Sequence, residues 1–317
     1  RGMRKLRVGL VFGGRSGEHE VSVMSAESIY SNLDKGKYEV IKIKIGKEGR
    51  WDWDLMKNVD VFFPIVHGTY GEDGSLQGLF ELLDVAYVGA GVLGSAVGMD
   101  KDVMKRLLLQ AKIRVADYVV LRKGEEHRKL KFPVFVKPAN MGSSVGISKA
   151  RNKPELQKAI SMAFEYDTKI LIEEAVSGQE VECAVLGNEK PEASVVGEII
   201  PKREFYDYQA KYVDENGAEL IIPARLSKKL AKKVRDSAKR AYLALECLGM
   251  ARVDMFVTAG GKVIVNEINT LPGFTSISMY PKLWEASGLE YPELIDRLIE
   301  LALERKKEKD RLKRSYS

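Results

Sequence analysis

The sequence predicts an α/β protein with a doubly wound parallel sheet at its N-terminal end and a mixed α+β part toward its C-terminal end. Two observations support this fold class. Over the first hundred residues, short apolar runs alternate with segments of helical periodicity, which is typical of a parallel sheet covered by helices. Later in the chain, two strand-like runs flank Gly260-Gly261, which indicates an antiparallel hairpin.

The N-terminal part alternates regularly between the two element types. Strands are expected at residues 6–12, 38–45, 59–66 and 85–88, and helices at 21–33 and 76–83. Two polar, glycine-rich loops, residues 13–20 and 67–74, each follow an expected strand. Because ligands of open α/β sheets collect at the carboxyl ends of the strands, both loops are candidate ligand-binding segments.

Two further units are expected after this sheet. The second unit has an expected helix from about Asp100, strands at 118–121, 134–137 and 169–173, and a helix at 155–166. The third has expected strands at 180–186 and 193–199, an irregular segment at 205–220, a helix at 227–248, the hairpin, and a helix from Pro292. We therefore expect three domains, at residues 1–98, 99–178 and 179–317.

The composition is that of an ordinary globular protein. The 317 residues are 45% hydrophobic and 30% charged, and no run reaches the roughly 18 apolar residues of a membrane span. With only Cys183 and Cys247, and no signal-peptide pattern, we expect a cytoplasmic protein without disulfides or a zinc site. The net charge of +6 comes from the basic ends of the chain, residues 1–7 and 304–317. We expect no nucleic-acid binding, since no aromatic-interleaved basic stripe occurs elsewhere.

The expected hairpin is the most informative segment. If Gly260-Gly261 forms a two-residue turn, Asp254 lies opposite Glu267 and Arg252 lies opposite Asn269. Because side chains alternate between the faces of a strand, all four emerge on one face. Two acids that face each other repel unless a cation lies between them.

Carboxylate and amide oxygens are ligands that suit Mg²⁺, which completes its shell with water and phosphate oxygens. We therefore interpret Asp254, Glu267 and Asn269 as metal ligands. The alternative is a surface hairpin with a cross-strand ion pair. A turn longer than two residues would shift the register and remove the argument.

The segment from Phe132 to Gly146 reads as a buried strand that ends in Lys137 and is followed by a loop of small residues. Glycines let backbone N–H groups approach phosphate, and the lysine supplies a positive charge. No P-loop sequence is present. Residues 142–146 match the G-x-S-x-G pattern of serine hydrolases, but all three histidines precede Ser144, whereas that triad needs a later histidine. A purely structural glycine turn is the alternative.

The first glycine-rich loop lacks the spacing of a dinucleotide-binding fingerprint, so a nicotinamide-dependent oxidoreductase is disfavoured. Glu18 and Glu20 in this loop either bind a ligand or complement the dipole of the following helix. His67 ends a strand in a glycine-rich loop, although a single histidine is more often structural.

Two other segments have candidate roles. Residues 169–180 join two units through a short connection whose backbone and carboxylates could contact a cofactor edge. The tyrosine-rich residues 205–220 are longer than an ordinary connection, as active-site lids often are. The alternatives are a generic linker for the first segment and an adaptable surface loop for the second.

Seven motifs, taken together and in order, resemble those of the D-alanine–D-alanine ligases of the ATP-grasp superfamily. They run from Gly13 to Met279 and read GGRSGEHEVS, HGTYGEDG, VKPANMGSSVG, IEEAVSGQE, YDYQAKY, RVDMF and NEINTLPGFTS. The resemblance covers nearly the whole chain and implies an ATP-grasp fold with three domains.

The resemblance also implies roles for individual residues. The nucleotide ligands would be Lys101, Lys137 and Ser144 at the phosphates, Glu173, Glu174 and Val176 at the adenine, Glu180 at the ribose, and Lys211. Asp254, Glu267 and Asn269 match the ligands of two Mg²⁺ ions, with Mn²⁺ as a substitute. The first D-alanine would contact Glu18 and His67, with Ser143 and Tyr212 linked to Glu18 by hydrogen bonds. Arg252 and the Gly273 N–H match an oxyanion site, and Lys211, Ser278 and the Met279 N–H face the second D-alanine.

The implied activity is the ATP-dependent joining of two D-alanines through a D-alanyl phosphate, for peptidoglycan synthesis, by a cytoplasmic homodimer. Tyr212 favours a dipeptide product, because related ligases that make D-alanyl-D-lactate lack a tyrosine in this local context. Two alternatives remain at this point: a D-alanine–D-lactate ligase and a catalytically silent ATP-grasp binding protein.

Overall fold

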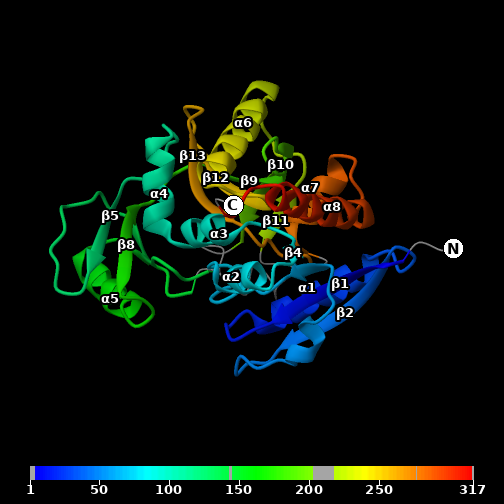
Figure 1. The fold of residues 1–317 in the computed structure, drawn as a ribbon. Coiled ribbons are helices and arrows are strands. Elements are labelled where there is room, and N and C mark those ends of the chain that lie inside the picture. Colours follow the sequence, from blue (N-terminus) through cyan, green and yellow to red (C-terminus); the bar gives the residue numbers. More distant parts are fainter. Residues whose placement is uncertain (1–3, 143–144, 203–217, 276, 316–317) are drawn as a thin grey trace.

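A computed structural model describes residues 4–142, 145–202, 218–275 and 277–315. The predicted residues Ser143, Ser144, Lys211 and Tyr212 lie outside this described part of the chain. The described chain forms three separate β-sheets with helices packed around them (Figure 1).

The N-terminal sheet is parallel and has the strand order β2-β1-β3-β4, as the alternating pattern predicted. Its elements are β1 (Leu6–Gly13), α1 (His19–Asn32), β2 (Tyr38–Ile45), a 3₁₀ turn (Trp53–Met56), β3 (Val61–Pro64), α2 (Ser75–Leu82), β4 (Ala86–Tyr87) and α3 (Val92–Met99). The sequence pattern missed α3 because most residues of this short helix are apolar and give little periodicity. The loops after β1 and β3 lie at the carboxyl edge of the sheet.

The middle of the chain forms an antiparallel sheet with the order β5-β8-β6-β7. Its elements are α4 (Lys101–Gln110), β5 (Tyr118–Arg122), β6 (Val134–Pro138), β7 (Ser148–Ala150), α5 (Lys153–Ala163) and β8 (Lys169–Glu174). The side chain of Asp100 caps α4 by accepting hydrogen bonds from the N–H groups of Asp102 and Val103 at 3.0 Å. This cap sets the first residue of the helix, Lys101, at the start of the site described below.

The C-terminal sheet has the order β11-β10-β9-β12-β13, with every described pair antiparallel. Its elements are β9 (Gln179–Gly187), β10 (Glu192–Pro201), β11 (Ala218–Ile221), α6 (Lys228–Ala244), β12 (Gly249–Val257), β13 (Val263–Asn269), α7 (Met279–Ala286) and α8 (Tyr291–Asp310). Figure 1 shows α6 over this sheet, and α7 and α8 between it and the N-terminal sheet. Helix α7 and strand β11 were not predicted.

The largest apolar core joins the two ends of the chain. Side chains of β1, α1 and β3 pack with those of β9, α7 and α8, so that Phe63 and Phe274 have ring centroids 6.3 Å apart. A second core packs α6 on the C-terminal sheet and includes Met104 and Leu108 of α4. These shared cores hold the sheet edges against one another, and none of the described helices is both long and apolar enough to cross a membrane.

Candidate active site

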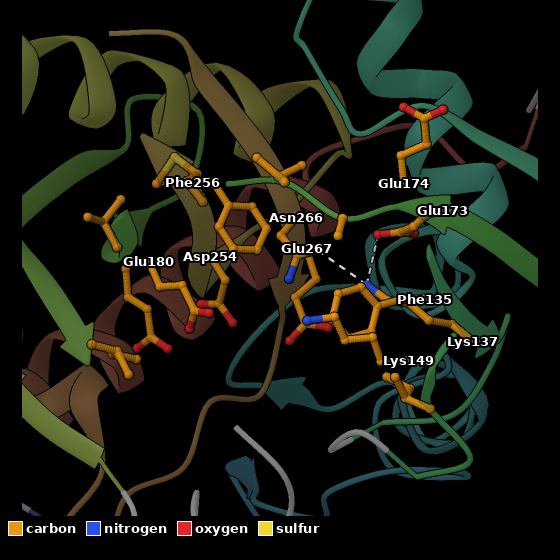
Figure 2. A pocket seen from close by; sticks show the side chains of 17 residues that line it. Phe135, Lys137, Lys149, Glu173, Glu174, Glu180, Asp254, Phe256, Asn266 and Glu267 are labelled. Atoms are coloured by element: carbon orange, nitrogen blue, oxygen red, sulfur yellow. Dashed lines mark hydrogen bonds and ion pairs between the residues drawn. The ribbon is translucent and has the colours of Figure 1, made fainter. Parts of the chain in front are cut away.

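A cavity of about 250 Å³ lies between the middle sheet and the C-terminal sheet (Figure 2). One wall carries Phe135 and Lys137 of β6 and Glu173 at the end of β8, and the other carries residues of β9, β12 and β13. The connection between β8 and β9, residues 175–178, contributes Ala175 and Val176 to the lining. Segments that the sequence indicated one by one as candidate functional regions therefore line the same cavity.

The hairpin of β12 and β13 has the predicted partners at its functional end. Asp254 lies opposite Glu267, and Arg252 lies opposite Asn269. The turn is nevertheless longer than predicted, because Thr258 rather than Ala259 pairs with Lys262, its N–H donating to the Lys262 carbonyl at 2.9 Å.

A β-bulge at Asn266 compensates for the longer turn. Val257 pairs with Val263 and Met255 with Val265, so the register changes between Asp254 and Met255. One extra residue in the turn and one extra residue in β13 cancel. The predicted pairing of Asp254 with Glu267 and of Arg252 with Asn269 is correct, while the two-residue turn from which it was argued is wrong.

Arg252 and Asp254 are directly connected on this face. Arg252 Nε and a terminal nitrogen donate to the two carboxylate oxygens of Asp254 at 2.8 and 2.9 Å. Glu182 of β9, which pairs with Asp254 in the sheet, lies 3.2 Å from Arg252 Nε. The sequence analysis did not predict Glu182. Glu182 is two residues from Glu180, so both side chains emerge on the same face of β9. The pairing of β9 with β12, however, joins distant segments and cannot be read from a local pattern.

The donor set on this face suits a hard cation. Asp254 and Glu267 both line the cavity, and Glu267 and Asn269 also line a smaller adjoining cavity of about 30 Å³. Two carboxylates and an amide oxygen around open space leave coordination positions for oxygens of another molecule, as Mg²⁺ requires. No cluster of three or more His, Cys, Asp or Glu side chains with metal-binding geometry occurs in the described residues, so the amide of Asn269 is an essential part of this interpretation.

Two predicted lysines border the same space. Lys137 Nζ donates to Glu173 Oε1 at 2.8 Å and to Asn266 Oδ1 at 3.4 Å (Figure 2). Lys101, at the first turn of α4, donates to the Met141 carbonyl at 2.6 Å and lines the smaller cavity with Glu267. The backbone of the phosphate-type loop and a lysine of another element thus meet beside the acidic face.

The predicted cofactor-binding carboxylates have different environments. Burial raises the pKa of Glu173, but the charges of Lys105 and Lys137 outweigh it and bring that pKa to about 2. Glu180 and Val176 line the cavity, with Glu180 across from Lys137 (Figure 2). The Glu174 carboxylate instead accepts a hydrogen bond from the Lys131 N–H at 2.8 Å and turns away from the cavity centre.

His67 links two loops. Its Nδ1–H donates to the Leu271 carbonyl at 3.1 Å, since a carbonyl can only accept, and its Nε2 accepts from the Ser25 hydroxyl at 3.3 Å. Ser25 Oγ in turn accepts from the Phe274 N–H at 3.2 Å. Burial is the main cause that lowers the pKa of His67, to about 4, so the ring is neutral at pH 7.

Two acids of the glycine-rich loops lie together beside His67. Glu18 is buried at the start of α1, and Glu72 accepts a hydrogen bond from the Gly68 N–H at 2.6 Å. Burial, followed by the charge of Glu18, raises the pKa of Glu72 well above its usual range. Sequence reasoning did not single out Glu72. The available signal was an acid within a glycine-rich loop at a strand's carboxyl end.

The remaining predicted residues lie in the segment that leads into α7. Ser278 is buried, and its hydroxyl accepts a hydrogen bond from the Thr275 N–H at 2.8 Å. Met279 is the first residue of α7, and Gly273 is buried next to Phe274, which contacts Ser25. These contacts join the segment to the loops that hold Glu18 and His67.

Comparison with known proteins gives a consistent result. The family described as D-ala D-ala ligase C-terminus matches residues 107–300, and that described as D-ala D-ala ligase N-terminus matches residues 7–56 and 52–90. The chain is 47% identical to D-alanine–D-alanine ligase A of Salmonella typhimurium, with 96% of this chain and 97% of the relative covered.

Solved structures of the same kind resemble the whole chain. The D-alanine–D-alanine ligase of Coxiella burnetii has a TM-score of 0.88 at 39% identity and 97% coverage of both chains. That of Bacillus anthracis complexed with ATP has 0.83 at 35%, with 97% of this chain and 100% of the other covered. The VanG D-Ala:D-Ser ligase of Enterococcus faecalis has 0.85 at 35%, with 94% and 100% covered. The predicted ATP-grasp fold is confirmed, and the chain belongs to the D-alanine–D-alanine ligase family.

Proposed function

We propose that this protein joins two D-alanine molecules into D-alanyl-D-alanine and converts ATP to ADP and phosphate, as a step of peptidoglycan synthesis. The observation that carries the proposal is the meeting of Asp254 and Glu267 with Lys137 around one cavity. This arrangement combines hard oxygen ligands with a cation, which is what the transfer of a phosphoryl group needs. The family membership supports the same activity.

The nucleotide would bind in the cavity between the two sheets. The residue 174–176 connection with Glu173 would contact the adenine and Glu180 the ribose, which agrees with their positions on the cavity wall. Lys101 and Lys137 would hold the phosphates, together with Ser144 and Lys211. Glu174 would contribute through its backbone, because its carboxylate accepts a hydrogen bond from the Lys131 N–H.

Asp254, Glu267 and Asn269 would hold two Mg²⁺ or Mn²⁺ ions, which neutralise negative charge on the phosphate oxygens. Arg252 donates hydrogen bonds to both carboxylate oxygens of Asp254 and lies 3.2 Å from Glu182, so these two acids would orient its guanidinium on the face of the metal ligands.

The first D-alanine would place its ammonium against Glu18, near His67. Its carboxylate oxygen attacks the terminal phosphorus of ATP, the bond to the bridging oxygen breaks, and ADP leaves. The product is a D-alanyl phosphate, whose acyl carbon is a better electrophile than that of a carboxylate. Ser143 and Tyr212 are proposed to hold Glu18 in place.

The second D-alanine would bind near Ser278, the Met279 N–H and Lys211. Its neutral amine attacks the acyl carbon and loses a proton, and phosphate leaves as the C–N bond is completed. The oxyanion formed on the way would accept hydrogen bonds from Arg252 and the Gly273 N–H. Tyr212 supports D-alanine over D-lactate at this position.

The larger organisation completes the proposal. We assign residues 1–98, 99–178 and 179–317 to three domains, because each range contains one of the three sheets. A homodimer in the cytoplasm is the state we propose, without membrane or nucleic-acid partners.

The direct test is ADP release with ATP, Mg²⁺ and D-alanine, followed by mass identification of the product. We expect ADP only when D-alanine is present, with D-alanyl-D-alanine formed, and loss of both on Glu267→Gln. L-Alanine, D-serine and D-lactate serve as comparison substrates. ADP release without D-alanine-dependent product would contradict the substrate assignment while leaving the nucleotide site intact.

A further inference from the structure

A buried lysine lies behind the wall of the cavity between the middle and C-terminal sheets. Lys105 is on α4, and its side chain is 1% exposed. It is not among the residues that line the cavity, whereas its ion-pair partner Glu173 is. Within the described residues, Lys105 Nζ makes no hydrogen bond of ordinary geometry and lies 3.3 Å from Glu173 Oε2. A fully buried ammonium group calls for an explanation, because desolvation of a charge is costly.

Glu173 is shared between two lysines on opposite sides. Its Oε1 accepts from Lys137 at 2.8 Å, and its Oε2 faces Lys105 at 3.3 Å. The side chain of Glu173 is 4% exposed. Burial has the largest effect on the pKa of Lys105 and lowers it, and the charge of Glu173 opposes this effect. With both lysines charged, the three groups carry one net positive charge at the cavity wall.

The two lysines differ in whether a ligand in the cavity can reach them. Lys137 lines the cavity beside Asn266, and Figure 2 shows its amine directed into it. Lys105 cannot be reached from there. A polyanion in the cavity would compete with Glu173 for Lys137 but could not compete for Lys105. If Lys137 left Glu173, only Lys105 would remain to balance the buried carboxylate.

We propose that Lys105 is a positioning residue for the nucleotide: it is the permanent counter-ion of Glu173 and thereby releases Lys137 to bind the phosphates. This inference rests on the proposed ATP-dependent function. Without Lys105, transfer of Lys137 to a phosphate would leave a buried carboxylate with no partner, so Glu173 would retain Lys137. Lys105 acts through Glu173 and Lys137 and touches no substrate itself.

A structural role is the competing explanation. Lys105 Nζ also lies 5.5 Å from the centre of the Tyr118 ring, so the side chain fills the space between α4 and the middle sheet. If packing were its only role, its loss would weaken the fold and disturb all ligands of the cavity alike. The two explanations therefore differ in whether the protein loses affinity for the phosphates of ATP alone or for the whole nucleotide.

The test is isothermal titration of the purified full chain with ATP plus Mg²⁺ and, separately, with adenosine. We expect Lys105→Met to weaken ATP binding by about tenfold or more. Adenosine binding should change far less, because adenosine does not need Lys137 and the Glu173–Lys137 pair stays intact. The ratio of ATP affinity to adenosine affinity should thus fall. An unchanged ratio would overturn the proposal.

A double variant makes the mechanism specific. In Lys105→Met/Glu173→Gln no carboxylate competes for Lys137, so the ATP-to-adenosine ratio should recover toward that of the wild type. A ratio as low as that of Lys105→Met alone would contradict the competition. If Lys105→Met does not fold, as judged by its melting temperature, Lys105→Gln carries the same test because it also removes the charge.

Lys306→Met is the matched control. Lys306 of α8 is a partly buried lysine that also forms ion pairs, with Asp84 at 3.2 Å and Asp310 at 2.6 Å, yet it neither lines the cavity nor contacts Glu173. Its ATP-to-adenosine ratio should equal that of the wild type, and an equal fall in this ratio would overturn the assignment to Lys105. Wild-type protein that fails to bind ATP would instead contradict the proposed function itself.

Discussion

Arg252 and Asp254 lie two residues apart on β12, and the guanidinium of the first donates to both carboxylate oxygens of the second. The residue proposed to meet an oxyanion is therefore the hydrogen-bonding partner of a proposed metal ligand. A change at Asp254 acts on both roles. This relationship gives the first prediction.

Asp254→Asn is expected to keep a hydrogen-bonding partner for Arg252 while it removes the charge that would attract a metal. Activity at a fixed low Mg²⁺ concentration should fall by about 100-fold or more, and the Mg²⁺ concentration for half-maximal activity should rise. Steady-state ADP release over a Mg²⁺ series measures both. Glu219→Gln, an exposed acid of β11, is the control and should leave the Mg²⁺ dependence unchanged.

Gly68→Ala should impair the first D-alanine site. Gly68 has φ of +79°, and a Cβ there would lie 2.6 Å from Glu18 Oε2. The new methyl group must displace the carboxylate proposed to bind the ammonium, so KM for the first D-alanine should rise more than KM for ATP. Initial rates with each substrate varied in turn separate the two effects.

Gly78→Ala in α2 is the matched control for this glycine, because a Cβ there meets nothing within 4 Å. Replacing a helical glycine should raise the free energy of unfolding by about 0.5–1 kcal/mol and leave both KM values unchanged. A rise in KM for D-alanine in this variant would mean that the effect of Gly68→Ala is not local.

His67 should make stability depend on pH between about 6.5 and 4. Its folded-state pKa, about 4, is below its usual value, so the unfolded chain binds the proton more readily. The contribution is full above pH 6.5 and is lost as the pH falls toward 4, at most about 3 kcal/mol. Urea unfolding across this range should show a smaller pH dependence in His67→Asn than in the wild type, and no such reduction in His127→Asn.

Much of the site could be predicted from the sequence because its motifs are local. A strand followed by a polar glycine-rich loop predicts both the parallel sheet and the edge at which Glu18 and His67 lie. The hairpin pattern placed Asp254 opposite Glu267, although the turn length was wrong and the bulge at Asn266 compensated for it. No local feature of the sequence predicts that bulge.

What escaped prediction depends on contacts between distant segments. Glu182 reaches the site through the pairing of β9 with β12, and Lys105 through the packing of α4 against β8. On an isolated helix, Lys105 reads as one of several exposed basic residues. Its burial is set by the neighbouring sheet, which a pattern within one helix does not describe.

Glu72 gives the last prediction, with the opposite pH dependence to His67. Burial and the adjacent Glu18 raise its folded-state pKa, so the folded chain holds this proton more tightly than the unfolded chain. Stability from this group is present at pH below the usual glutamate value and is lost as the pH rises through the raised pKa. Glu72→Gln keeps the shape of the protonated acid and cannot ionise. We therefore expect it to be more stable than the wild type at pH 8 and similar at pH 4.5, in urea unfolding without ligands. If the wild type were as stable as Glu72→Gln at pH 8, the pKa of Glu72 would not be raised in the folded chain.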